Sequence, residues 1–130
     1  MAIRILRLGS PRRRGEGPRL GTVRRPPRGV GKQDYAQRNF YDAWLPELAP
    51  SDALLAWARS RPFTPARWAQ FARGYRREMT LPGAHRLLAL IALLSQHTNL
   101  SVGCYCEDET YCHRRVLRDL LTEAGAVIAG

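Results

Sequence analysis

Residues 82–104 read PGAHRLLALIALLSQHTNLSVGC, and this stretch decides the fold. Pro82 can open a helix, because the N–H that proline lacks has no partner in the first turn anyway. The leucines that follow cover most sides of a helix predicted over residues 82–97. The next apolar residues alternate as in a short strand: Leu100, Val102 and Cys104. A long apolar helix that leads directly into a strand is typical of an α/β fold.

The flanking sequence predicts further strands and a final helix. Residues 3–8 form a short, β-branched apolar run that stops at Gly9, and residues 20–23 are a second short candidate strand. Residues 111–124 carry one apolar helical stripe, after which Gly125 is a natural stop. We therefore predict an α/β fold with a small, largely parallel, Rossmann-like sheet flanked by helices, in a single domain over residues 1–130.

Three helices are predicted in the middle of the chain. Residues 32–44 place aromatic and alanine side chains at helical spacing, and Pro46 closes that segment. Ser51 is a good N-cap for a short helix to Arg59, and Thr64 before a proline opens another. We interpret the aromatic residues on these helices as core, with a base-stacking surface as the alternative.

Positive charge is concentrated near the N-terminus. The formal net charge is +10, and residues 1–32 supply +9 of it, from ten basic residues against Glu16 alone. Much of this charge lies in a loop of arginine, proline and glycine at about residues 9–31. Such a segment attracts anions, although the use of twenty arginines and one lysine is also what a GC-rich genome produces.

The apolar runs and the cysteine count indicate in which cellular compartment the protein is expected. The longest apolar run, residues 87–94, is far shorter than the roughly 20 residues that a membrane-spanning helix needs. The N-terminus shows no apolar stretch of signal-peptide length. Three clustered cysteines, an odd number, do not indicate a disulfide scaffold. We therefore expect a cytoplasmic protein with no membrane partner.

The segment GCYCEDETYCHRR, residues 103–115, is the densest in reactive side chains. It lies where a predicted strand ends and a helix begins, which is where open parallel sheets bind ligands. Cys112 and His113 fall in the first turn of that helix, whose N-terminus favours a thiolate or a bound anion. The three carboxylates at residues 107–109 disfavour both the thiolate and the bound anion, because their negative charges repel them. Cys112 is thus either a nucleophile or an inert buried thiol.

Two other interpretations of this segment can be weighed. Cys112 and Arg118 have the Cys-x5-Arg spacing of tyrosine phosphatases, but the residues between them are bulky and helical, so we exclude that class. A zinc site is possible, because thiols and an imidazole could complete a Cys3His set. Its ligands would be Cys104, Cys106, Cys112 and His113.

Distributed motifs resemble a known family. They are Arg24, Pro27-Arg28-Gly29-Val30, Lys32, Trp44-Leu45, Glu47-Leu48-Ala49-Pro50-Ser51, Trp57, Trp68, Phe71, Tyr75 and Glu78. Over residues 3–121 the chain resembles the YeaO-like branch of the bacterial domain-of-unknown-function family number 488. Cys106 and Cys112-His113-Arg114 resemble the ending of the wider family, whereas the YeaO-like branch usually lacks these cysteines. Val23 and Pro26 depart from the family's usual acidic residue and tryptophan.

The resemblance implies a compact α/β fold in which arginines from two loops meet near the cysteine segment, and it brings no established reaction. We expect a small anion pocket for a phosphorylated ligand, such as a nucleotide or another phosphorylated metabolite. Its residues would be Arg24, Arg28 and Arg114 as charges, with Cys112 and His113 as nucleophile or acid and base. The alternatives are a nucleic-acid binding module that uses residues 12–28, and a solvated basic loop over a core thiol. No particular cofactor or oligomeric state follows from the sequence.

Overall fold

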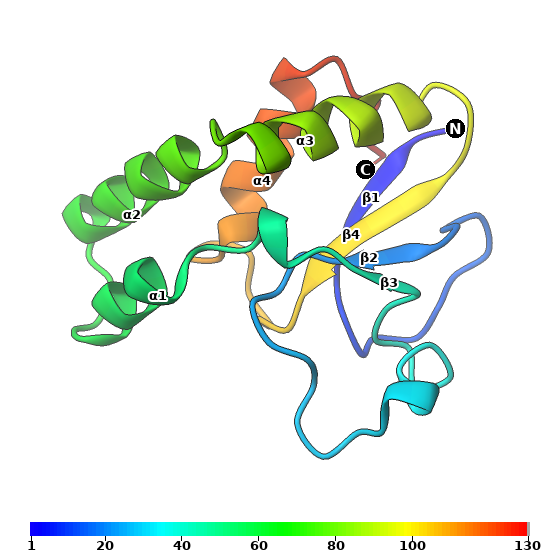
Figure 1. The fold of residues 1–130 in the computed structure, drawn as a ribbon, viewed down its shortest axis with the longest axis horizontal. Helices are drawn as coiled ribbons and strands as arrows, with labels where there is room; N and C mark the ends of the chain where they lie inside the picture. The colour runs from blue at the N-terminus through cyan, green and yellow to red at the C-terminus, as the bar shows by residue number, and fades with distance from the viewer. Residues whose placement is uncertain (130) are drawn as a thin grey trace.

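The computed structural model describes residues 1–129 and contains one four-stranded sheet (Figure 1). The strands are β1 (Ile3–Arg7), β2 (Arg19–Gly21), β3 (Ala43–Trp44) and β4 (Leu100–Cys104). They lie in the order β1-β4-β2-β3, and every pairing is parallel. This confirms the predicted α/β fold with a small parallel sheet. Three strands lie where they were predicted, and β3 was not predicted.

Four α-helices accompany the sheet in the described residues: α1 (Asp52–Arg59), α2 (Pro65–Glu78), α3 (Pro82–Leu94) and α4 (His113–Glu123). The predicted caps form, because the Ser51 and Thr64 hydroxyls accept hydrogen bonds from the backbone N–H groups of Leu54 and Arg67. Gly125 follows α4 with a φ of 94°, the left-handed conformation that favours glycine at a helix end.

The two faces of the sheet are covered differently. On one face, Ile3, Leu100 and Val102 join the main apolar core with side chains of α2, α3 and α4. Figure 1 shows these helices gathered on one side, with α1 and α2 reaching beyond the end of the sheet. The other face includes Gly103, where a Cβ would come within 3.0 Å of the side chains of Leu6 and Leu8. That face is covered by the loops that follow β1 and precede β3, so backbone packs closely against it.

A second apolar cluster lies at the carboxyl end of the strands. It consists of Leu8, Val23, Tyr41, Cys104 and Cys112, which come after β1, after β2, before β3, at the end of β4 and before α4. The partly buried rings of Tyr35, Phe40 and Tyr105 pack against it. The cysteine segment is therefore packed into this end of the fold.

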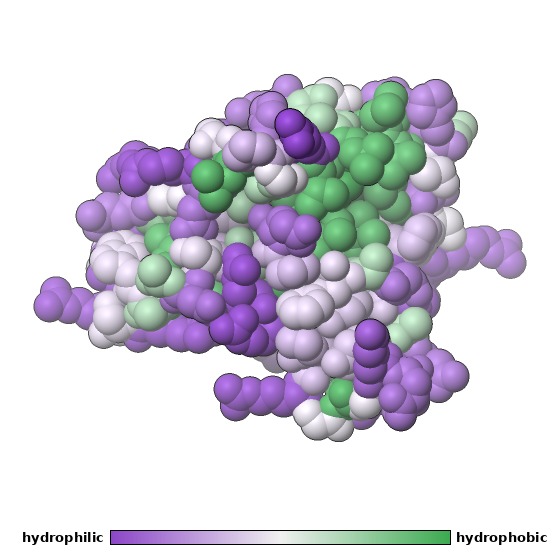
Figure 2. Space-filling model, in the orientation of Figure 1, coloured by the Kyte–Doolittle hydropathy of each residue, from purple (hydrophilic) through white to green (hydrophobic). Residues whose placement is uncertain are grey.

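Helix α3 is less enclosed than its sequence predicts. Leu88 and Ile91 are buried, but Leu90, Leu93 and Leu94 are exposed. Figure 2 shows the resulting apolar patch over α3. The leucines thus surround the helix, while the protein covers only one side of it.

The predicted helix over residues 32–44 is wrong. Only Lys32–Asp34 form a single 3-10 turn, and Asn39 adopts a φ of 64°, which no right-handed helix accommodates. The chain must turn here because β3 has to reach β2, where the Asp42 N–H donates to the Arg19 carbonyl. The aromatic spacing reflects packing on the second apolar cluster instead.

Helices long and apolar enough to cross a bilayer are absent from residues 1–129.

Candidate functional site: three cysteines between β4 and α4

The site occupies the connection between the central strand and the last helix. Cys104 is the final residue of β4, Cys112 is the N-cap of α4, and Cys106 lies in the loop between them. The carboxyl end of β4 and the N-terminus of α4 therefore meet at this site, as the sequence predicts.

The three sulfur atoms converge. All Sγ atoms lie within 4.8 Å of one another, and those of Cys104 and Cys112 are 2.8 Å apart. Cys104 and Cys112 are each only 2% exposed, whereas Cys106 is exposed. Cys106 is therefore the thiol of this group that a solute can reach.

His113 is buried beside Cys112 in a defined orientation. Its Nε2 lies 2.7 Å from the Thr22 carbonyl oxygen, which can only accept a hydrogen bond, so Nε2 carries the proton. In the neutral ring Nδ1 then has a free lone pair, and it lies 3.9 Å from the Cys112 Sγ. The Tyr75 ring holds the imidazole edge-on, with ring centroids 5.4 Å apart. His113 can thus accept a proton or ligate a metal through Nδ1.

Arg114 brings a positive charge to the sulfur atoms. It is 4% exposed, and one terminal nitrogen donates to the Cys106 carbonyl oxygen over 2.7 Å. Its Nε is buried and has no hydrogen-bond partner among the described residues. An unpartnered buried donor beside thiols is suited to a thiolate or to a bound anion.

These contacts divide the thiols by acidity. Hydrogen bonds from Cys104 and Cys112, with the charge of Arg114, lower the pKa of Cys106 below that of an ordinary thiol. The hydrogen bond from Cys104 also lowers the pKa of Cys112. Donation to Cys106 and Cys112, together with burial, raises the pKa of Cys104. Cys106 and Cys112 are therefore more acidic than an ordinary thiol, and Cys104 is less acidic.

Comparison with known families assigns the chain to one of them. Residues 3–125 match the family model DUF488-N3a, described as the active DUF488-N3 subclade. The chain belongs to the DUF488 family. This confirms the resemblance to family number 488 that the distributed motifs indicate. Curated proteins and solved structures give no match to this DUF488 chain.

The structure brings some of the predicted site residues of this DUF488 protein together and places others apart. Cys112, His113 and Arg114 come together with Cys104 and Cys106. Arg24 instead donates to the carbonyl oxygens of Ala49 and Pro50, each over 3.1 Å. Arg28 lies exposed in the loop after β2. Arg24 therefore stabilises the turn before α1, whereas Arg114 lies beside the three thiols.

The basic loop of the DUF488 chain is organised by an ion pair that the sequence analysis missed. Arg19 is 0% exposed and forms hydrogen bonds with both carboxylate oxygens of Glu16, at 2.9 and 3.0 Å. It also donates to the carbonyl oxygens of Ser10, Pro11 and Asn39. The one signal for it is that Glu16 is the single acidic residue among the first 32.

Proposed function

We propose that this DUF488 chain is a cysteine-dependent enzyme that acts on a small phosphorylated molecule. The observation that carries the proposal is one exposed thiol, Cys106, beside two buried thiols and the buried guanidinium of Arg114. Reactive cysteines occur in such electropositive, partly exposed surroundings, whereas structural thiols are inert. Cys106 joins Cys112 and His113, the catalytic residues expected from the sequence.

The chemistry would be nucleophilic. The Cys106 thiolate forms a bond to an electrophilic atom of the substrate while the bond to the leaving group breaks. Cys112, next to His113 Nδ1, gives its proton to the leaving group, and the water that later releases the intermediate returns a proton to this pair. Arg114 balances the negative charge throughout, and the first N–H groups of α4 face a phosphate.

The family description supports a catalytic role. The matching model is described as an active subclade, and we extend that word to this chain as part of the proposal. Roles for Arg24 and Arg28 in binding the phosphate remain predictions. Arg28 is the better candidate, since carbonyl oxygens occupy the Arg24 guanidinium.

A covalent intermediate tests the proposal. Incubation with a panel of phosphorylated metabolites, followed by intact-mass and peptide mass spectrometry, should reveal an adduct on Cys106. Cys106→Ser should abolish both adduct and turnover, while Arg28→Ala should raise KM and leave kcat close to its original value. Arg86→Ala, at an exposed position on α3, is the matched control for Arg28→Ala. Turnover that survives in Cys106→Ser would refute the assignment.

We propose zinc binding as a second candidate function of the same thiols. The specific observation is three sulfur atoms within 4.8 Å of one another, with His113 Nδ1 close to Cys112. Zn–S bonds of about 2.3 Å need sulfur atoms about 3.8 Å apart, so Cys104 and Cys112 would have to rotate apart. Zn²⁺ with three thiolates carries one net negative charge, which Arg114 would offset.

Metal analysis separates the two candidates. Protein purified without chelators should contain one zinc per chain by elemental analysis if the thiols are ligands, and Co²⁺ should give the visible bands of tetrahedral thiolate coordination. His113→Gln should weaken binding, whereas the exposed His85→Gln should not. Metal-free protein with a freely alkylated Cys106 would rule out the zinc candidate.

A further inference from the structure

Cys106 is the point at which an oxidant can reach the three thiols. It is exposed, whereas Cys104 and Cys112 are each only 2% exposed. All three are free cysteines, and their Sγ atoms lie within 4.8 Å of one another. Hydrogen peroxide converts an accessible thiol to a sulfenic acid, which a neighbouring thiol converts to a disulfide. The site therefore has one thiol that meets the oxidant and two buried thiols that can react with the product.

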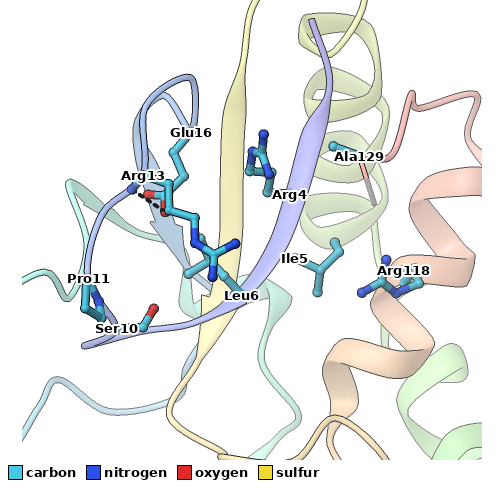
Figure 3. Close-up of a pocket in the computed structure, with 9 residues that line it drawn as sticks. All are labelled: Arg4, Ile5, Leu6, Ser10, Pro11, Arg13, Glu16, Arg118 and Ala129. Carbon is cyan, nitrogen blue, oxygen red and sulfur yellow. Dashed lines mark hydrogen bonds between the residues drawn. The ribbon is translucent and has the colours of Figure 1, made fainter.

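The loop that carries Cys106 is tied to helix α4. One terminal nitrogen of Arg114 donates to the Cys106 carbonyl oxygen over 2.7 Å. Arg118 projects from the same helix, as Figure 3 shows, and pairs with Glu109 of this loop over 2.8 Å. The N-cap of α4 is Cys112. The two contacts therefore keep Cys106 near Cys112 when its sulfur is oxidised.

Cys112 is better placed than Cys104 to attack an oxidised Cys106. His113 Nδ1 has a free lone pair and lies 3.9 Å from the Cys112 Sγ, so it can take the proton of this thiol. The Cys112 side chain makes no capping hydrogen bond to α4, which leaves it able to rotate toward Cys106. Cys104 instead ends β4, and its carbonyl oxygen accepts from the Leu8 N–H over 2.8 Å, which fixes it in the sheet.

We propose that hydrogen peroxide oxidises Cys106 to a sulfenic acid, which Cys112 captures as a Cys106–Cys112 disulfide. In the first step the Cys106 sulfur bonds to one peroxide oxygen and the O–O bond breaks. The sulfur loses two electrons to the peroxide, and the other oxygen takes the thiol proton and leaves as water. In the second step the two sulfur atoms bond and the S–O bond breaks. His113 passes the Cys112 proton to the departing hydroxide, which leaves as water.

The disulfide occupies the thiol that the proposed enzyme uses as its nucleophile. Oxidation therefore switches turnover off, and a dithiol restores it. This consequence rests on the proposed function, but the disulfide itself forms without any substrate.

Peptide mapping of the full chain tests the proposal. The protein is treated with hydrogen peroxide, its remaining thiols are alkylated in denaturant, and cleavage after residues 107–109 separates Cys106 from Cys112. Mass spectrometry should show the loss of two hydrogens, a link between Cys106 and Cys112 and an alkylated Cys104, all reversed by dithiothreitol. A link that includes Cys104, or three alkylated cysteines, would overturn the proposal.

Variants assign the step in which each residue acts. Cys112→Ser should leave a sulfenic acid on Cys106 that dimedone traps, and further oxidation should carry it to the sulfinic acid. Cys106→Ser should protect Cys112 from peroxide in the folded protein. His113→Gln should slow disulfide formation about tenfold or more and leave the formation of the sulfenic acid unchanged. The exposed His85→Gln is its control. Equal rates in these two variants would contradict proton transfer through His113.

Turnover is measured separately, on reduced and on oxidised protein. A disulfide that forms in a protein without turnover in the reduced state would support the oxidation site and refute the proposed enzyme. Turnover in the reduced state with no disulfide after peroxide would refute the oxidation site and leave the proposed enzyme intact.

Discussion

Arg19 and Glu16 form the ion pair on which the arrangement of the N-terminal loop depends. Both side chains are almost fully buried, and the Arg19 guanidinium also binds three carbonyl oxygens. Its hydrogen bond to Glu16 lowers the pKa of that carboxyl group below its usual 4.5 in the folded state. The ionised carboxylate therefore stabilises the fold above that value, and this contribution is lost as the pH falls through the lower, folded-state pKa.

Removing the carboxylate should be costly. We expect Glu16→Gln to lower the free energy of unfolding by about 3–5 kcal/mol at pH 7, because it leaves the Arg19 charge buried without its partner. Urea denaturation at pH 7 and at pH 3.5 should show the difference between variant and parent shrinking in acid. Glu47→Gln, at an exposed site, is the control. A loss that stays the same at both pH values would contradict the ionic role of Glu16.

Cys106 should behave as a thiolate over a wide pH range. Its pKa lies below the ordinary thiol value, so the rate of iodoacetamide labelling should change little between pH 6 and 9, where a free thiol becomes steadily faster. Arg114→Met should raise the pKa of Cys106 only in part, because the hydrogen bonds from Cys104 and Cys112 remain after the positive charge is removed. Peptide mass spectrometry can follow each cysteine separately. Cys104, protonated and buried, should label slowest in the folded protein.

Local sequence predicts the residues of the site better than their partners. Cys112, His113 and Arg114 are neighbours in the chain, so their grouping at the start of a helix follows from the pattern alone. The acidity of Cys106 does not, because it needs the Sγ atoms of Cys104 and Cys112 to converge in space. The position of Arg24 depends on two carbonyl oxygens about 25 residues away, which no side-chain motif records.

At the scale of elements, periodicity predicts the helices well and fails where the chain is irregular. Helices α1 and α2 begin directly after their predicted caps, Ser51 and Thr64, since capping residues act locally. Helix α3 begins at Pro82 as predicted, and α4 begins within two residues of its predicted start. Residues 32–44 imitate a helix because Ala36, Phe40 and Trp44 are four residues apart. The chain instead turns back at Asn39, and the rings of Tyr35 and Phe40 pack on the second apolar cluster. The two residues of β3 are too few to show a strand pattern.

Helix α3 provides a test of which leucines hold the fold together. Leu88 is 5% exposed and Leu93 is 57% exposed. Leu88→Ala should reduce the free energy of unfolding by about 2–5 kcal/mol through the cavity it leaves, whereas Leu93→Ala should stay within about 0.5 kcal/mol. Chemical denaturation measures both. Equal losses would mean that the exposed leucines are covered in solution.

Across the whole molecule, ion pairs within the fold neutralise much of the positive charge of the N-terminal segment. Arg12 pairs with Asp42, Arg25 pairs with Asp52, and Arg19 is buried. The exposed arginines of residues 12–28 that remain without a carboxylate in these ion pairs are Arg13, Arg14 and Arg28. A nucleic-acid partner would therefore contact a few separate positive charges on this segment and not a continuous basic stripe.

The salt dependence of duplex DNA binding should reflect the number of these unpaired arginines, which is three. Three arginines that neutralise three phosphates give a slope of about −2.7 in a plot of log K against log salt concentration. Filter binding or anisotropy between 50 and 200 mM salt measures it. Replacing Arg13 and Arg14 with alanine should flatten the slope. A slope near −6 or steeper would instead favour the nucleic-acid alternative, since it would require the paired arginines to bind phosphate as well.

The central position of β4 has a consequence for how the protein is made. A ribosome adds about 5–20 residues per second from the N-terminus. Residues 3–7 are among the first to emerge, but their neighbours in the sheet, residues 100–104, come after most of the chain. Until then the first strand has no partner, while the helices between can form locally. A nascent chain halted before residue 100 should therefore be readily digested by proteases, and resistance should develop only after β4 has left the exit tunnel.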